Sequence, residues 1–492
     1  MNLTTMNAQG EAKAIFRWMV LIFVSVVIGT NYYVYDAMSS IKSVMQSQLG
    51  FSSTDYGLIV SFYSVPNTFL LMAIFGGIIL DKWGIRKTGF LFLTFCVLGT
   101  FLTAYGASGY FQHGGFGHGF FSLFLTKFSP ELKIMMLGRL LFGLGAETSI
   151  VVISKIIVKW FKGKELAFAF AINLAIARLG TAAALIFSPV FIDPASIATY
   201  LNSMSGITKT IFSPFVGLLG SLSQGSYNLF GWTSAIWIAA VLMGVGLVFF
   251  VIYMFFDKSY ERINEQGRLL APDEEFHLKD IWDLLKNKAF IYISLLCVTF
   301  YSAVFPFQAY CPDLLHNKFG VSIGMSGTLT SLIIWGTIVF TPLFGGFVDR
   351  KGKRASLMFI GSFLLIFVHL ILSLTYFTPY IAMFILGIAF SLVPAAMWPA
   401  VALIVEEKKL GTAYGLMTSI QNLGLSAFPF LAGVILDKTN TGISQQMLDT
   451  GKATLNYTYT ILMFAGLGII GFLFAYLLKR EDGKSGNRLE FK

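Results

Sequence analysis

The sequence contains little charge and few cysteines. Only 12% of its 492 residues are charged and 56% are hydrophobic, whereas a soluble domain carries about 25% charged residues. The three cysteines, Cys96, Cys297 and Cys311, have the spacing of neither a disulfide framework nor a zinc site. The metalloprotease pattern H-E-x-x-H and the phosphate-binding pattern G-x-x-x-x-G-K-[ST] do not occur. These absences exclude a large soluble enzyme, and we expect no enzymatic activity, no cofactor and no metal.

Long apolar runs take up most of the chain. A transmembrane helix needs about 20 such residues, and the sequence contains twelve runs of roughly this length. They lie at residues 15–40, 55–80, 87–106, 133–159, 164–190, 232–256, 289–315, 324–348, 355–376, 379–405, 410–436 and 457–479. No cleavable signal peptide precedes the first run. We predict an all-α polytopic membrane protein with twelve transmembrane helices.

Basic residues gather on one side of the predicted spans. Of the 35 lysines and arginines, most lie at the termini and in the loops that follow even-numbered spans. Because basic loops stay in the cytoplasm, we predict that both termini and the 257–288 linker are cytoplasmic. The net charge of +10 then reflects membrane topology, and we expect no nucleic-acid partner.

The two halves of the sequence repeat one turn. Residues 77–84 and 345–352 both have the pattern G-x-x-x-D-[RK]-x-G, each after the second span of a six-span half. Two copies at equivalent places indicate parallel repeats. We therefore predict two pseudo-symmetric six-helix bundles at 1–256 and 289–492, joined by the linker. Asp81, Arg86, Asp349 and Arg350 in these turns are our candidates for conformational gating.

The first half has an insertion that the second half lacks. It is a Gly- and Phe-rich loop at 106–132 on the non-basic side, and it contains His113 and His118. Two histidines without a third type of ligand do not predict a metal site. A second semi-polar segment on this side, at 191–231, is expected to lie at the membrane interface.

Two isolated charges lie in the middle of consecutive spans. Glu147 is in the fourth span and Arg178 in the fifth, and a charge at mid-membrane depth costs about 2.5–3.5 kcal/mol. Such a pair is either a ligand site or a structural ion pair that locks two helices together. At the repeat offset of the second half, their equivalents are the neutral residues Ser391 and Asn422. This asymmetry favours a ligand site.

The twelve spans, the repeated turn and the central linker resemble the major facilitator superfamily. The residues Arg139-x-x-x-Gly143-x-Gly145-Ala146 are also similar to the fourth-span motif of that superfamily. The resemblance covers nearly the whole chain and implies a transporter fold of two six-helix bundles. The first turn departs from the superfamily pattern at Ile85, where a basic residue is usual.

Several short blocks resemble more specifically the dipeptide transporters of animal lysosomes. They are NYYVYD (31–36), FGLGAE (142–147), WFKGKEL (160–166), ARLG (177–180), AVFPF (303–307), WP (398–399), LGTAYG (410–415) and SIQNLG (419–424). The resemblance implies facilitated, uniport-type transport of dipeptides. It also implies that Glu147 and Arg178 hold the two charged ends of the peptide and that Trp398 lines the cavity. The long 106–132 loop and the short N-terminus are departures from this family.

The chemistry of the two charges suits a dipeptide zwitterion. Its ammonium and carboxylate are roughly 6 Å apart, so a carboxylate and a guanidinium on opposite walls can hold it end to end. Arg178 offers a planar fork for the carboxylate, and Glu147 takes the ammonium. A free amino acid is too short to reach both. We predict broad dipeptide selectivity with weak preference for side chains.

Other polar and aromatic residues of the spans are weaker candidates for substrate contacts. Trp398 and Asn422 are the better of these candidates, because of the family resemblance and the repeat position. Tyr35, Tyr63, Tyr301 and Gln308 are each explained equally well as helix–helix contacts.

Two transport mechanisms stay open. The first is facilitated uniport by alternating access, and the second is proton-coupled symport of peptides or another small organic anion, with Glu147 as proton carrier.

The expected partners are the dipeptide and the lipid bilayer, with no accessory subunit. We expect a multi-pass protein of a cell membrane. Because no sorting signal precedes the first span, a bacterial inner membrane is favoured, or a lysosomal membrane if the source is an animal.

Overall fold

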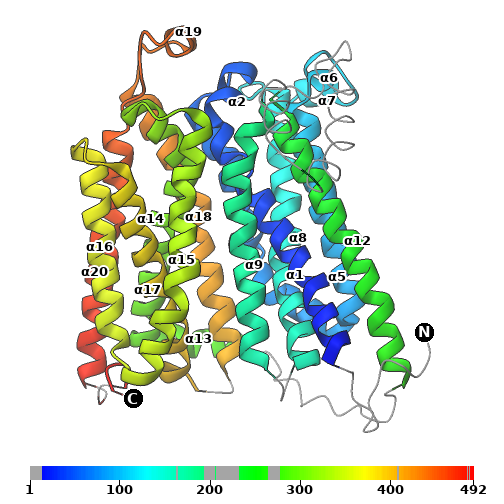
Figure 1. Ribbon diagram of the computed structural model, residues 1–492, viewed down its shortest axis with the longest axis vertical. Helices are drawn as coiled ribbons and strands as arrows, with labels where there is room; N and C mark the ends of the chain where they lie inside the picture. Colours follow the sequence, from blue (N-terminus) through cyan, green and yellow to red (C-terminus); the bar gives the residue numbers. More distant parts are fainter. Residues whose placement is uncertain are drawn as a thin grey trace.

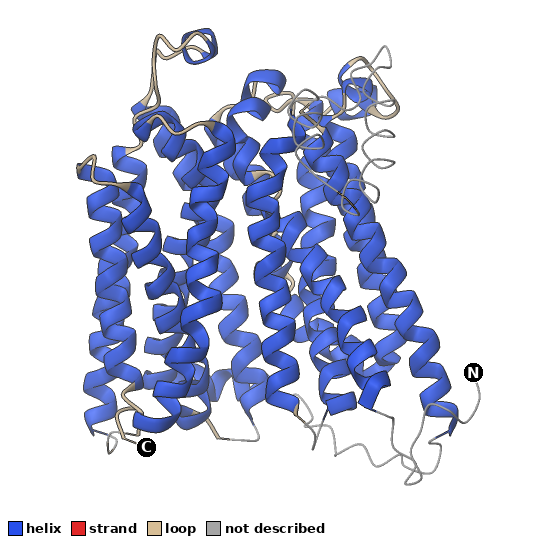
Figure 2. Ribbon diagram, viewed as in Figure 1, coloured by secondary structure: helices blue, strands red, loops and turns tan. Residues whose placement is uncertain are grey.

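The computed structural model describes residues 14–161, 165–192, 206, 232–263, 278–406, 409–484, 486 and 488–491. Every regular element in these residues is a helix, as Figure 2 shows. Eleven of the helices are long and apolar enough to cross a membrane, and they run side by side (Figure 1). The predicted all-α membrane fold is therefore confirmed. Most of the predicted outer segment at 191–231 and the linker residues 264–277 lie outside the described residues.

The first half of the chain begins with a helix that crosses the molecule and ends with another. Its elements are α1 (Ala14–Asp36), η1 (Ser39–Ile41), α2 (Lys42–Leu49), α3 (Ser53–Phe62), α4 (Val65–Phe69), α5 (Met72–Ala107), α6 (Gly109–Gln112), α7 (His118–Ser122), α8 (Pro130–Phe161), α9 (Leu166–Phe187), η2 (Ser188–Ile192) and α12 (Ser234–Ile263). We call α1–α12 the N-terminal half. Its α1, α5, α8, α9 and α12 enclose a core of apolar side chains.

The predicted span at 55–80 is built from several helices in place of one continuous helix. This stretch consists of α3, α4 and the start of α5, with a left-handed residue at Leu71 (φ 49°) before α5. Pro66 near the start of α4 has no backbone N–H to donate, which favours a helix start there. In addition, α5 continues through the predicted third span and changes direction at Gly84 (φ 78°, ψ 166°). Because Gly84 separates two helical stretches within α5, the second predicted span corresponds to α3, α4 and the start of α5, and the third to the rest of α5.

The second half of the chain is more regular. Its helices are α13 (Leu278–Lys286), α14 (Lys288–Phe319), α15 (Ile323–Lys351), α16 (Arg354–Leu374), α17 (Pro379–Ile404), α18 (Leu410–Thr439), α19 (Gln445–Asp449) and α20 (Thr458–Lys484). We call them the C-terminal half. Helix α13 of the linker is attached to the start of α18, because Lys409 Nζ donates to Asp283 Oδ2 at 3.0 Å. This hydrogen bond raises the pKa of Lys409.

The segment 320–324 has the letters of the nucleophile pattern G-x-S-x-G. In hydrolases that pattern lies between a strand and a helix. Here it joins two helices, and the Ser322 side chain accepts a hydrogen bond from Met325 N as the N-cap of α15. Ser322 is therefore a helix cap.

The two halves lie beside each other and make unequal contacts at their two ends. We call the end at which α1 begins and α20 ends the basic end, at the bottom of Figure 1, and the opposite end the far end. The halves meet where α3 packs against α18 and α9 packs against α15. Glycines permit the first contact, since a Cβ at Gly57 would lie 2.4 Å from Pro429 O and one at Gly433 would lie 2.1 Å from Ser53 O.

Candidate functional site

Glu147 lies in α8 with one hydrogen-bond donor beside it. Tyr63, between α3 and α4, donates its hydroxyl to Glu147 Oε1 at 2.9 Å. Gly143, one turn earlier in α8, allows this contact, because a Cβ there would lie 1.9 Å from Tyr63 O. Two predicted site residues are thus brought together by a close approach that only glycine permits.

Arg178 lies in α9 against an aromatic ring of the other half. Its guanidinium carbon is 4.8 Å from the ring centroid of Phe390 in α17. Gly180 brings α9 close to α1, since a Cβ there would lie 2.1 Å from Gly29 O. Among the described residues, no carboxylate lies within 4.0 Å of the Arg178 guanidinium.

Glu147 and Arg178 do not form an ion pair with each other. At about 1.5 Å per residue, Glu147 lies about 21 Å from the basic-end terminus of α8, and Arg178 about 18 Å from that of α9. Their depths in the bundle therefore match. Both side chains are only partly buried. In this conformation, therefore, α8 and α9 are not held together by a structural ion pair between Glu147 and Arg178.

The C-terminal half presents four aromatic side chains near Arg178, which we call the aromatic wall: Tyr301, Phe305, Phe390 and Trp398. The rings of Tyr301 and Phe305 stack at 5.6 Å, and the Phe390 ring meets both edge to face, at 6.1 Å and 5.4 Å. Trp398 Nε1 donates to the Tyr301 hydroxyl at 2.9 Å. Two predicted site residues, Tyr301 and Trp398, are therefore in direct contact.

Tyr35 connects the aromatic wall to the surroundings of Glu147. Its ring lies 6.1 Å from Phe305 of the C-terminal half and 4.7 Å from Tyr63. A series of side-chain contacts therefore leads from Glu147 to Arg178. Its members are Tyr63, Tyr35, Phe305 and Phe390. Aromatic side chains of both halves thus link the two charged groups.

Gln308 and Asn422 are not brought to this cluster by any contact among the described residues. Gln308 is buried and donates Nε2 to Asp36 Oδ1 at 3.1 Å, which joins α14 to α1. Asn422 is buried and donates to Thr418 O of its own helix at 3.0 Å. Ser391, the repeat equivalent of Glu147, also donates to backbone, to Gly387 O and Gly336 O. Gln308 thus joins two helices, whereas Asn422 bonds within its own helix and its buried Oδ1 has no described hydrogen-bond partner.

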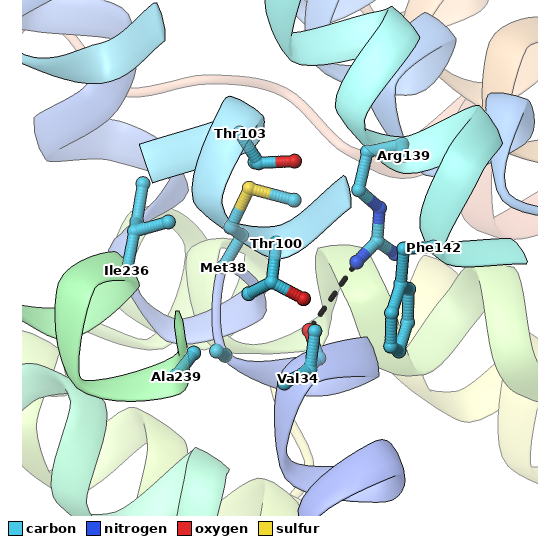
Figure 3. Close-up of a pocket in the computed structure, with 9 residues that line it drawn as sticks. Val34, Met38, Thr100, Thr103, Arg139, Phe142, Ile236 and Ala239 are labelled. Atoms are coloured by element: carbon cyan, nitrogen blue, oxygen red, sulfur yellow. Dashed lines mark hydrogen bonds between the residues drawn. The ribbon is translucent and has the colours of Figure 1, made fainter. Parts of the chain in front are cut away.

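A small cleft inside the N-terminal half surrounds Arg139. It is lined by side chains that include Val34, Thr100 and Phe142, and Figure 3 shows the guanidinium reaching to Val34 O. A second bond, at 3.3 Å, goes to Tyr35 O. Arg139 thus satisfies carbonyl groups in the last turn of α1. This cleft contains none of the eight predicted substrate-contact residues.

The predicted gating residues differ between the two repeats. In the first turn Asp81 forms an ion pair with Lys155. Arg86 lies 3.6 Å from Asp257 Oδ2, and this carboxylate also accepts from Lys159 at 2.7 Å. All of these pairs lie within the N-terminal half.

The second turn makes no such contact with the part of the chain that the structure describes. Asp349 and Arg350 are exposed, and neither forms an ion pair with a described residue. In this conformation the two repeated turns therefore do not have equivalent contacts.

A buried ion pair at the far end was missed by the sequence analysis. Lys42 Nζ of α2 lies 2.6 Å from Asp313 Oδ2 of α14, and the side chains are 0% and 2% exposed. Lys42 also donates to Gln46 Oε1 at 2.7 Å, and the Tyr457 hydroxyl donates to Asp313. The sequence pattern around Lys42 indicated only a loop charge. The buried ion pair between Lys42 and Asp313 joins the two halves.

A helix cap adds a second connection at the far end. Asp437 of α18 accepts hydrogen bonds from the backbone N–H groups of Ser53 and Thr54 at the start of α3, at 2.9 Å and 2.8 Å. The Tyr310 hydroxyl contacts Ser53 O at 3.2 Å and donates to Pro429 O at 2.9 Å. An acidic group at a helix N-terminus is favoured by the helix dipole. Here the acid and the helix belong to different halves.

A model of the Major Facilitator Superfamily matches residues 21–316 and 309–492. The chain therefore belongs to this superfamily and is a membrane transporter. Solved structures show the same fold. The nucleoside transporter NupG is 13% identical with a TM-score of 0.63, covering 93% of this chain and 98% of that one. A bacterial homologue of the human lysosomal transporter Spinster, in an inward-facing and occupied conformation, is 15% identical with a TM-score of 0.65, covering 95% and 98%.

Within the superfamily, the chain is similar to proteins named lysosomal dipeptide transporter MFSD1. The human protein is 28% identical over 474 residues, which cover 96% of this chain and 88% of that protein. The protein of cattle is 30% identical over 424 residues, which cover 86% and 80%. The family resemblance found in the sequence is confirmed. A hexuronate transporter of Bacillus subtilis is more distant, at 22% identity over 489 residues, covering 96% of this chain and 98% of that protein.

Proposed function

We propose that this protein carries dipeptides across a membrane by alternating access, as a facilitated uniporter. Glu147 binds the substrate ammonium, and Arg178 binds its carboxylate. The names of the relatives point to this substrate class. The observation that carries the proposal is that these two opposite charges lie at matching depth and neither has an ion-pair partner among the described residues.

Unpaired charges at this depth favour a charged ligand. Moving a charge into the membrane interior without a partner costs several kcal/mol, and binding a zwitterion supplies both partners at once. Arg178 keeps its fork of N–H groups available for a carboxylate, because its described neighbour is the ring of Phe390. Glu147 accepts only the Tyr63 hydroxyl among the described donors, so it has lone pairs left for an ammonium.

The contacts between the halves fit one stage of alternating access. Hydrogen bonds between described residues of the two halves run from the far-end surface to the level of Thr68 and Ser426, whose hydroxyls are 3.4 Å apart. If the basic end faces the cytoplasm, as the positive-inside pattern predicts, this conformation is closed toward the outside. Substrate release to the cytoplasm would then precede the opening of the far end.

Thermal stabilisation of the purified protein tests the proposal. A panel of dipeptides, single amino acids and sugars is added to the wild type and to the variants Glu147→Gln and Arg178→Ala. We expect dipeptides of varied side chains to raise the melting temperature of the wild type and of neither variant. Stabilisation by amino acids or sugars, but not by dipeptides, would contradict the substrate class.

Proton-coupled symport of a peptide or another small organic anion is the second candidate. It is favoured by the buried Asp36, which accepts from Gln308 across the halves and has no described cation within 4.0 Å. A buried carboxylate without a cation is a suitable proton carrier. In proteoliposomes without a membrane potential, uniport predicts no change of internal pH during dipeptide uptake. Acidification of the interior that follows the peptide would support symport.

The proposal places the protein in a cell membrane with its basic end in the cytoplasm. Both a bacterial inner membrane and a lysosomal membrane give this orientation. Impermeant labelling of a cysteine introduced at exposed Tyr376, in the far-end loop after α16, tests the orientation. We expect labelling only from the side opposite the cytoplasm.

A further inference from the structure

The contact between Arg178 and Phe390 joins the two halves at the proposed substrate site. Arg178 belongs to α9 of the N-terminal half and Phe390 to α17 of the C-terminal half, and the guanidinium carbon lies 4.8 Å from the ring centroid. The Phe390 side chain is 1% exposed. A cation over the face of a desolvated ring is attracted by its quadrupole. The C-terminal half therefore contacts this charge without contributing a charge of its own.

Other members of the aromatic wall fix the Phe390 ring. Phe305 meets it at 5.4 Å with the planes 86° apart, and Tyr301 meets it at 6.1 Å and 84°. The Tyr301 hydroxyl is itself held by Trp398 Nε1. Dense packing by these rings restricts rotation of the Phe390 side chain. It presents a rigid surface to Arg178.

A ring and a carboxylate can contact one guanidinium together. The guanidinium is planar, stacks on aromatic rings by its face and carries its N–H donors along its edge. The edge forms the parallel pair of hydrogen bonds that a carboxylate accepts. An aromatic ring against the face of the guanidinium limits how its N–H edge can be oriented. The edge itself stays free for the carboxylate. This reduces the ordering that substrate binding would otherwise require.

We propose that Phe390 is a positioning residue for the substrate carboxylate: it orients the Arg178 guanidinium from the opposite half of the transporter. This inference rests on the proposed function, in which Arg178 binds that carboxylate. Because the two residues belong to different halves, the guanidinium is oriented only while the halves are in contact at this depth. Carboxylate binding and this inter-half contact therefore support each other.

A comparison of a dipeptide with its C-terminal amide tests Phe390. The amide has no carboxylate, so its affinity does not depend on the orientation of Arg178. For Phe390→Leu we expect the dissociation constant of the free dipeptide to rise about 5- to 30-fold, while that of the amide changes by less than about 2-fold. Phe384→Leu is the matched control, because it removes a phenylalanine ring of the same helix α17 that packs on Phe340 and has no described contact with Arg178 or Phe390. It should weaken neither ligand.

The outcomes separate this inference from the proposed function. If Arg178→Ala weakens the free dipeptide and the amide equally, Arg178 does not bind the carboxylate and the proposed function fails. If Arg178→Ala weakens the free dipeptide more than the amide, but Phe390→Leu affects the two ligands equally, only the inference about Phe390 is overturned.

Fluorinated phenylalanines at position 390 keep the test valid if the leucine variant does not fold. One, two and three fluorine atoms weaken the ring quadrupole stepwise with little change in shape. We expect a stepwise loss of affinity for the free dipeptide and none for the amide. Equal affinities along the series would contradict a cation–π role for Phe390.

Discussion

The two ends of the interface between the halves are built differently. At the far end, Lys42 and Asp313 form a fully buried ion pair across the halves, and Asp437 caps a helix of the opposite half. At the basic end, the described ion pairs of Asp81 and Asp257 stay within the N-terminal half. Asp81 and Lys155 are partly exposed, and Asp257 is buried but its two basic partners are partly exposed. Buried charges are far more costly to separate than exposed ones. The difference indicates that opening the far end is the harder of the two movements.

The largest effect is expected from removing one member of the buried pair. Lys42→Ala leaves Asp313 buried without its cation, which costs about 3–5 kcal/mol. The double variant Lys42→Met/Asp313→Leu should recover most of this loss, because neither charge then remains. Thermal unfolding in detergent measures both. Equal losses in the single and double variants would mean that packing, and not charge, holds the far end together.

A smaller effect is expected at the cap on α3. Asp437→Ala removes the acceptor of two backbone N–H groups and should cost about 1–2 kcal/mol, whereas Asp437→Asn keeps an acceptor and should cost less. Asp449→Ala is a matched control, since Asp449 also joins the halves but through an exposed bond to Ser47 at 3.1 Å. It should change stability by about 0.5 kcal/mol or less. If Asp437→Ala and Asp449→Ala lower the free energy of unfolding equally, the buried contact at the far end is no stronger than the exposed one.

The smallest effects are expected at the repeated turns of the basic end. The side chains of Asp81 and Lys155 are 46% and 35% exposed, so Asp81→Asn should cost about 0–1 kcal/mol and less at high salt. Asp349→Asn should not change the melting temperature, because Asp349 has no described ion-pair partner. A larger loss for Asp349→Asn than for Asp81→Asn would show that the second turn is the one that stabilises this conformation.

Periodic and repeated features of the molecule were predictable from the sequence. The long apolar runs, the repeated turn and the two lone charges at Glu147 and Arg178 follow from residue type and spacing. Helix breaks were less visible, because Leu71 adopts a left-handed conformation that no local sequence pattern requires.

Contacts between distant segments were not predictable. Lys42 has the sequence surroundings of an ordinary loop charge, and its partner Asp313 lies 271 residues later in the chain. Phe390 is one of 50 phenylalanines, so residue type alone could not single it out. Only the position of its ring against Arg178 of α9 assigns it a partner.

Binding of chemically blocked dipeptides tests the central claim most directly. Calorimetry compares one dipeptide, its N-acetyl form and its C-terminal amide on the wild type, Glu147→Gln and Arg178→Ala. We predict that the wild type prefers the unblocked peptide, that Glu147→Gln binds the free and acetylated forms equally, and that Arg178→Ala binds the free and amidated forms equally. If each variant still discriminates against both blocked forms as the wild type does, then Glu147 and Arg178 do not hold the ends of the substrate.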